Sequence, residues 1–425
     1  MQRPGAWCPG LVLPGERRDE VVSRREEAEL GKDKPGLAGT VGLLALGALL
    51  MYADRTTLYP MLKVIGERFH LSGTATGAIT STYFFLYVAM QVPAGLLGDR
   101  LGLKRVLAIF FALGGLALLL LGLTAQSYAA LLFLVGLHGV GMGAFYPTSY
   151  GINIGTVPRE RRGLASAVMN SGMSVGTALG LAFSGPLYLW SGNFRLPFLV
   201  LAVPTLALPV LFWRGLPEVQ KTAPYGAGEG AGFSFARILG DRDLWALNFA
   251  AFCSGYGFWV ALTWGPSFFA TERGLSVAGA GALTALAAIS AIPAALYVGR
   301  LSDRIGRRRL TLILYPLAAL TVFALAHAKS LPALVALLII YGLVGRTVSD
   351  TIVISWFGDH ISRKVPQALG AAVGVFNLIG MSSAIVAPLV SGLVKDLTGS
   401  LTGAFYLGGA VVLLGTAFAA LAREA

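Results

Sequence analysis

The chain has 425 residues, of which 55% are hydrophobic and 13% are charged, and its mean hydropathy is +0.70. Soluble proteins carry about 25% charged residues, so this composition excludes an ordinary soluble domain and predicts a membrane protein. The net charge of +12 does not indicate nucleic-acid binding, because the basic residues stand between long apolar runs. With only Cys8 and Cys253, neither a disulfide framework nor a cysteine metal site is expected.

Residues 1–37 contain no apolar core of the kind that a secretory signal needs, so we expect a polar cytoplasmic tail. A helix crosses a bilayer with roughly 20 apolar residues. Six such runs follow the tail, near 38–61, 74–97, 106–125, 128–153, 163–189 and 195–213. Residues 214–243 form a predicted cytoplasmic linker, rich in glycine and proline. Six more runs lie near 244–270, 277–299, 309–328, 331–357, 365–393 and 402–422.

The sequence therefore predicts an all-α polytopic membrane protein with 12 transmembrane helices in two six-helix halves, residues 38–213 and 244–425. Cytoplasmic loops of such proteins hold an excess of lysine and arginine. With both termini inside, 25 of the 33 basic residues fall on the cytoplasmic side. We therefore expect a multi-pass protein of the plasma (inner) membrane with cytoplasmic termini. One chain contains both halves, so we expect a monomer.

The two halves repeat a motif at equivalent places. The run from Gly95 to Arg105 follows the second span, and the run from Gly299 to Arg309 follows the eighth. The first glycine is expected to let two helices approach closely, the aspartate to face a basic neighbour or a helix N-terminus, and the second glycine to form a tight turn. The predicted conformational latch comprises Gly95, Asp99, Arg100, Gly102, Gly299, Asp303, Arg304 and Gly306.

The doubled pattern G-x-L-[GS]-D-R-x-G-x-[RK]-[RK] in a chain of six plus six helices resembles the signature loop of the major facilitator superfamily. The resemblance covers residues 38 to 422 and implies a secondary transporter that works by alternating access. The first copy departs from the pattern at Leu103, where the family usually has a basic residue.

Five titratable residues lie within predicted spans: Asp54, Arg55, His138, Arg346 and Asp350. A charge at membrane depth is costly unless it lines a cavity or is paired, so each is a functional candidate. Adjacent helical positions differ by about 100° in direction, so the first two cannot face one small spot. In one interpretation, Arg55 binds the substrate anion and Asp54 binds a proton. In the alternative, the charges form a structural ion pair or serve packing at a helix end.

The run Asp54-Arg-Thr-Thr-Leu58 is similar to the start of the anion:cation symporter branch and to the spinster-like lipid transporters. In those families the matching Asp and Arg serve proton coupling and substrate binding, which the resemblance transfers to Asp54 and Arg55 only. Many relatives also carry an arginine and a glutamate in span 4. Here the arginine position is Leu132, and no acidic residue lies between Leu131 and Tyr150.

His138 is the one titratable group in span 4, and its reference pKa near 6.5 suits a proton site. A buried histidine that is hydrogen-bonded to a carbonyl is the alternative. Arg346 and Asp350 stand at i and i+4 on one helix face, where they can neutralise each other. Alternatively, Arg346 is a second anion anchor and Asp350 releases it on protonation.

Further polar or aromatic residues are candidates for the substrate path, although most are expected to serve packing or interhelical hydrogen bonds. Those predicted to bind substrate are Tyr83, Tyr87, Gln91, Tyr146, Asn170, Tyr256, Trp259 and Asn377. The glycines of span 5, Gly172, Gly176, Gly180 and Gly185, partly match a motif of drug:proton antiporters. Small-residue helix packing is the favoured interpretation.

The leading hypothesis is proton-coupled uptake of a small organic anion, a carboxylate or a sugar acid, held near the midplane between the halves. The alternative is a proton-coupled exporter of drugs or lysolipid-like amphiphiles. No nucleophile-base pair, phosphate loop or metal cluster appears in the sequence, so an enzyme is not expected and no cofactor is required.

Overall fold

The computed structural model describes residues 36–219, 240–364 and 369–424; the side chains of residues 159, 295, 296, 346–350 and 369–371 are outside this description. The predicted N-terminal tail and the middle of the predicted linker therefore lie outside the described residues. The first group of helices comprises α2 (Leu37–Arg68), α3 (Gly73–Leu101), α4 (Leu103–Thr124), α5 (Tyr128–Gly143), α6 (Phe145–Thr156), η1 (Arg159–Arg161), α7 (Arg162–Ser191) and α8 (Leu196–Gly215).

The second group comprises α10 (Arg242–Trp259), the π-helical η2 (Val260–Trp264), α11 (Gly265–Glu272), α12 (Val277–Ile305), α13 (Arg307–His327), α14 (Leu331–Val344), α15 (Arg346–Lys364), α16 (Leu369–Thr398) and α17 (Thr402–Leu421). Nine helical segments among the described residues are long and apolar enough to cross a membrane. The predicted fold class, a polytopic helical membrane protein, is confirmed. The exact domain boundaries stay a prediction.

Three of the predicted spans are interrupted rather than straight. Span 4 is divided at Ala144 between α5 and α6, span 7 contains η2, and span 10 is divided at Gly345. Each break lies beside a glycine or a proline, residues that disfavour a continuous helix. The apolar runs alone do not reveal these breaks.

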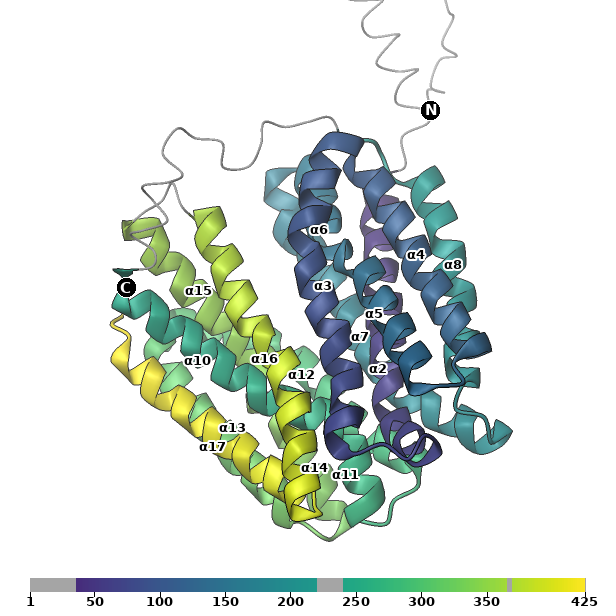
Figure 1. Cartoon of the computed structure of the whole chain (residues 1–425). Helices are drawn as coiled ribbons and strands as arrows, with labels where there is room; N and C mark the ends of the chain where they lie inside the picture. Colours follow the sequence, from purple (N-terminus) through teal and green to yellow (C-terminus); the bar gives the residue numbers. More distant parts are fainter. Residues whose placement is uncertain (1–35, 220–239, 365–368, 425) are drawn as a thin grey trace, which may run out of the picture.

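The two groups of helices meet at one end and diverge toward the end where α2 begins and α17 ends (Figure 1). At the closed end, α3 packs against α16 and α7 packs against α12. Glycines make the first contact close: a Cβ at Gly77 would lie 2.2 Å from the carbonyl oxygen of Pro388. The Asp396 carboxylate accepts hydrogen bonds from the backbone N–H of Gly73 (2.5 Å) and of Thr74 (2.8 Å). A side chain of one group thus caps a helix of the other.

The repeated motif lies in helix ends rather than in long loops. Helices α3 and α12 continue to Leu101 and Ile305, so each aspartate stands in the last turn. The second glycines form the turns as expected, since φ is +95° at Gly102 and +92° at Gly306.

The expected close approach at the first glycines is not made in this conformation. A Cβ at Gly95 would be 3.7 Å from Pro147, an ordinary contact, and nothing lies within 4 Å of one at Gly299. These helix ends lie where the two groups diverge, which explains the space (Figure 1). Asp303 faces the basic neighbour Arg307 at 3.9 Å, while Asp99 is exposed. The latch role of the motif stays a prediction.

The glycines of α7 serve helix packing, as the favoured interpretation of the sequence has it. A Cβ at Gly176 would lie 2.1 Å from the carbonyl oxygen of Leu49, and one at Gly180 would lie 2.3 Å from that of Ala53. Helix α7 therefore lies directly on α2 and fixes the helix that carries Asp54 and Arg55.

Candidate functional site

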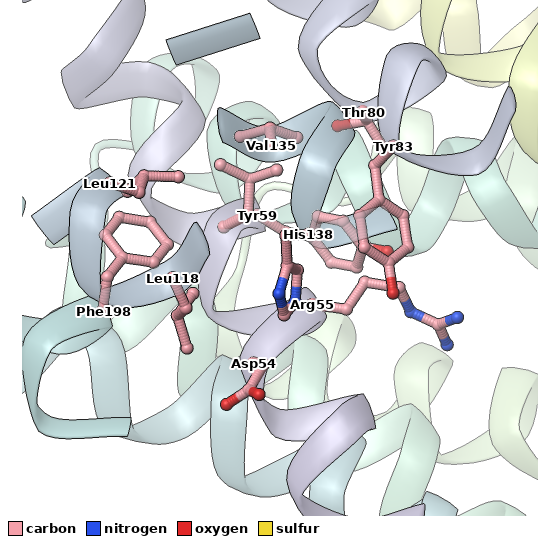
Figure 2. A pocket seen from close by; sticks show the side chains of 11 residues that line it. Asp54, Arg55, Tyr59, Thr80, Tyr83, Leu118, Leu121, Val135, His138 and Phe198 are labelled. Carbon is pink, nitrogen blue, oxygen red and sulfur yellow. The ribbon is translucent and has the colours of Figure 1, made fainter. Parts of the chain in front are cut away.

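Helix α2 carries the two charged residues that define the site. Asp54 and Arg55 are buried, with 1% and 4% of their surfaces exposed. Because neighbouring positions of a helix point about 100° apart, the two side chains diverge, as Figure 2 shows. They form no ion pair with each other.

Arg55 lies in the wall of a cavity of about 510 Å³ between the two groups of helices. Its Cζ atom is 4.0 Å from the ring centre of Tyr52, 5.1 Å from that of Phe84 and 5.5 Å from that of Trp259. Trp259 belongs to the second group of helices, so the guanidinium touches both groups. Aromatic faces stabilise a cation by roughly 0.5–2 kcal/mol each.

No carboxylate of the described residues lies within ion-pair distance of Arg55, and its Nε–H has no hydrogen-bond partner there. Among the described residues that line the cavity, Arg55 alone carries a formal charge. A buried cation is costly without a counter-charge. An anion that enters the cavity would supply the missing partner.

Most of the residues predicted to bind substrate line this cavity. Those that do are Arg55, Tyr87, Gln91, Tyr146, Asn170, Trp259 and Asn377. Tyr83 instead lines a small neighbouring pocket, and Tyr256 is buried in the core away from both. The side chains of Arg346 and Asp350, at the start of α15, are outside the described residues, so their roles stay predictions.

Asp54 faces a different side of α2, toward helix α8. Its carboxylate accepts hydrogen bonds from the Thr205 hydroxyl, at 2.9 Å from Oδ2 and 3.2 Å from Oδ1. Thr205 is itself fully buried. A carboxyl group whose described partner is a neutral hydroxyl can exchange a proton without breaking an ion pair.

A pocket of about 20 Å³, the size of one water molecule, is lined by Asp54 and His138 and also by Arg55. His138 Nδ1 lies 2.9 Å from the carbonyl oxygen of Gly114, which matches the structural alternative for this residue. Its Nε2 has no described partner, and neither do the hydroxyl groups of Tyr59, Thr80 and Tyr83 that line the same pocket. Figure 2 shows these side chains around the pocket.

Sequence reasoning missed several residues of the site. Tyr52 lies under the Arg55 guanidinium, and its hydroxyl is 3.0 Å from that of Tyr146. The sequence could have indicated Tyr52, because positions 52 and 55 are i and i+3 on one helix face. Thr205, the partner of Asp54, is an isolated hydroxyl in an apolar run. Nothing local in the sequence marks it.

Comparison with known proteins places this architecture in a family. The model of the Major Facilitator Superfamily matches residues 44–388. The chain is 27% identical to a probable sulfoacetate transporter of Cupriavidus necator, over 88% of this chain and 91% of that protein. It is 25% identical to a probable galactarate/D-glucarate transporter of Bacillus subtilis, over 87% of this chain and 88% of that protein.

The fold is shared with a bacterial homologue of the human lysosomal transporter spinster, whose crystal structure is inward-facing and unoccupied. The TM-score is 0.73, at 18% sequence identity, over 90% of this chain and 94% of that one. The predicted resemblance is thereby confirmed at the level of the superfamily. The chain belongs to the Major Facilitator Superfamily and is a multi-pass membrane transporter of a small molecule, not an enzyme.

Proposed function

We propose that this protein imports a small organic anion, a carboxylate or a sulfonate, across the plasma membrane by alternating access, driven by protons. The observation that carries the proposal is the buried Arg55 guanidinium, which faces the cavity without a described counter-charge. The relatives named as sulfoacetate and galactarate/D-glucarate transporters support an anionic substrate.

In this mechanism the anion binds at Arg55, and Asp54 carries the proton on the other side of α2. The cavity lies between the two groups of helices, so an anion bound there would lie where both groups can close around it. The two groups of helices diverge toward the end where α2 begins and α17 ends (Figure 1), and with the predicted cytoplasmic termini this arrangement would be a cytoplasm-facing state. The protein is proposed to act as a monomer in the lipid bilayer.

The test is uptake of labelled sulfoacetate, D-glucarate and tartrate by the purified protein in liposomes with an acidic exterior. We expect Arg55→Ala to lower uptake by about 30-fold or more, because truncating one partner of a buried charge pair costs at least 2 kcal/mol. Arg68→Ala is the matched control, since Arg68 is exposed at the end of the same helix. Melting temperatures and Arg55→Lys distinguish loss of binding from loss of folding. Unchanged uptake of every anion by folded Arg55→Ala would falsify the proposal.

A further inference from the structure

The two walls of the cavity differ in chemistry. Of the 11 lining residues from the first group of helices, nine carry a polar or charged side-chain group, Arg55 among them. Of the 14 from the second group, nine are apolar. Helix α12 alone contributes Ala287, Ala288, Ala291 and Ile292. A substrate that fills the cavity therefore meets a charged, polar wall on one side and an apolar wall on the other.

Several polar side chains that line the cavity already form hydrogen bonds within the protein. Asn170 accepts a hydrogen bond from Tyr150 (3.0 Å), and Asn377 donates one to Gln91 (3.1 Å) across the two groups. The hydroxyl of Thr177 donates to a carbonyl of its own helix, at 2.9 Å. A ligand with many hydroxyl groups would have to displace such bonds, because an unpaired polar group is costly to bury.

The apolar wall favours contact with an apolar part of a ligand. Besides the residues of α12, this wall contains Leu262, Leu338, Met381 and Phe258. The hydroxyl of Thr284, a polar residue of α12 in this wall, donates to the Ala280 carbonyl oxygen at 2.8 Å. An apolar or aromatic body would lose water against this wall without leaving hydroxyls unpaired. A cavity of about 510 Å³ is also within the range that holds ligands much larger than a two-carbon acid.

From these walls we infer that the substrate is an amphipathic organic anion, with one carboxylate or sulfonate at Arg55 and an apolar or aromatic body against α12. Ala288 is then a specificity-determining residue, because a small side chain at this half-buried position leaves room for that body. This inference rests on the proposed function, since it takes the anion site at Arg55 as given and adds the chemistry of the remainder of the substrate.

The test compares thermal stabilisation of the purified full-length protein by phenylacetate, phenylmethanesulfonate, sulfoacetate and gluconate. Binding to the folded state raises the melting temperature by mass action. We expect the two phenyl anions to act at concentrations about tenfold or more below gluconate. Ala288→Leu is expected to weaken the phenyl anions about tenfold and leave sulfoacetate unchanged, because the added side chain occupies the space of the ring. Ala282→Leu, an exposed position of the same helix outside the cavity, is the control.

The outcomes separate the two proposals. If gluconate and sulfoacetate bind in an Arg55-dependent manner and the phenyl anions do not, the inference is wrong and the anion transporter stands. If none of the four anions stabilises the protein, and labelled uptake is also independent of Arg55, the proposed function itself is wrong. If Ala288→Leu does not fold, Ala288→Ser is tested instead, because it barely changes the volume of the side chain. It is expected to shift the preference toward gluconate, and an unchanged preference counts against the inference.

Discussion

Helix α2 has two sides that differ in almost every physical respect, although the residues that mark them are adjacent. On one side, Arg55 faces a cavity of about 510 Å³, is surrounded by aromatic rings and has no described counter-charge. On the other, Asp54 adjoins a pocket of about 20 Å³ and is held by a threonine hydroxyl. One side has room for a solute and the other for a water molecule at most.

The difference indicates that the proposed anion and proton sites lie on different faces of α2, with Arg55 lining both the cavity and the small pocket. On this proposal neither ligand would displace the other, so coupling would act through the position of α2 rather than through competition for one site. Helix α7 packs against α2 through glycine contacts and also packs against α12 of the second group. A shift of α2 can therefore move α12 through α7. Substitutions on the two sides of α2 are expected to have different consequences.

Among substitutions around the small pocket, the largest expected effect comes from Asp54→Asn. The amide keeps the size of the side chain but cannot carry the proton, so we expect proton-driven accumulation of sulfoacetate or D-glucarate in liposomes to be lost. Exchange of labelled for unlabelled anion should persist, because the Arg55 side is untouched. Accumulation and exchange are measured on the same liposomes, with Arg55→Ala as the contrasting variant that loses both. Retention of full accumulation by Asp54→Asn would place the proton elsewhere.

An intermediate effect is expected from His138→Gln. His138 lines the small pocket with Asp54, and its Nε2 has no described partner. We expect accumulation to fall several-fold while exchange is unchanged. The double variant with Asp54→Asn should be no worse than Asp54→Asn alone, because residues that act as a unit are not additive. If His138→Gln lowers only the melting temperature, the bond to the Gly114 carbonyl is its whole role.

The difference between the sides of α2 was partly predictable. Charged residues in an apolar run stand out against the cost of burying charge, and the angle between neighbouring helical positions separates Asp54 from Arg55. The apolar runs and the repeated motif likewise predicted the polytopic helical fold. These signals are local, so a sequence shows them directly.

The remainder depends on contacts between distant segments. Tyr83 and Tyr87 are four residues apart on α3, yet Tyr83 lines the small pocket and Tyr87 the large cavity. Tyr256 and Trp259 are three residues apart and both lie in the core, yet only Trp259 lines the cavity. Which tyrosine reaches the cavity depends on how α3 and α10 are rotated against their neighbours. The partnership of Thr205 with Asp54 joins positions 151 residues apart, which no local pattern encodes.

The smallest expected effect comes from that partnership. Thr205→Val keeps the volume of the side chain and removes the hydroxyl that donates to Asp54, so the carboxyl group loses its described partner in a buried place. Leaving such a group without a partner costs about 1–3 kcal/mol, and we expect a lower melting temperature with anion exchange unchanged. Thr205→Ser should restore stability, whereas Thr124→Val, at an exposed helix end, should change little. If Thr205→Val abolished exchange as Arg55→Ala does, the two sides of α2 would not be independent, and the separation of the proton and anion sites would be wrong.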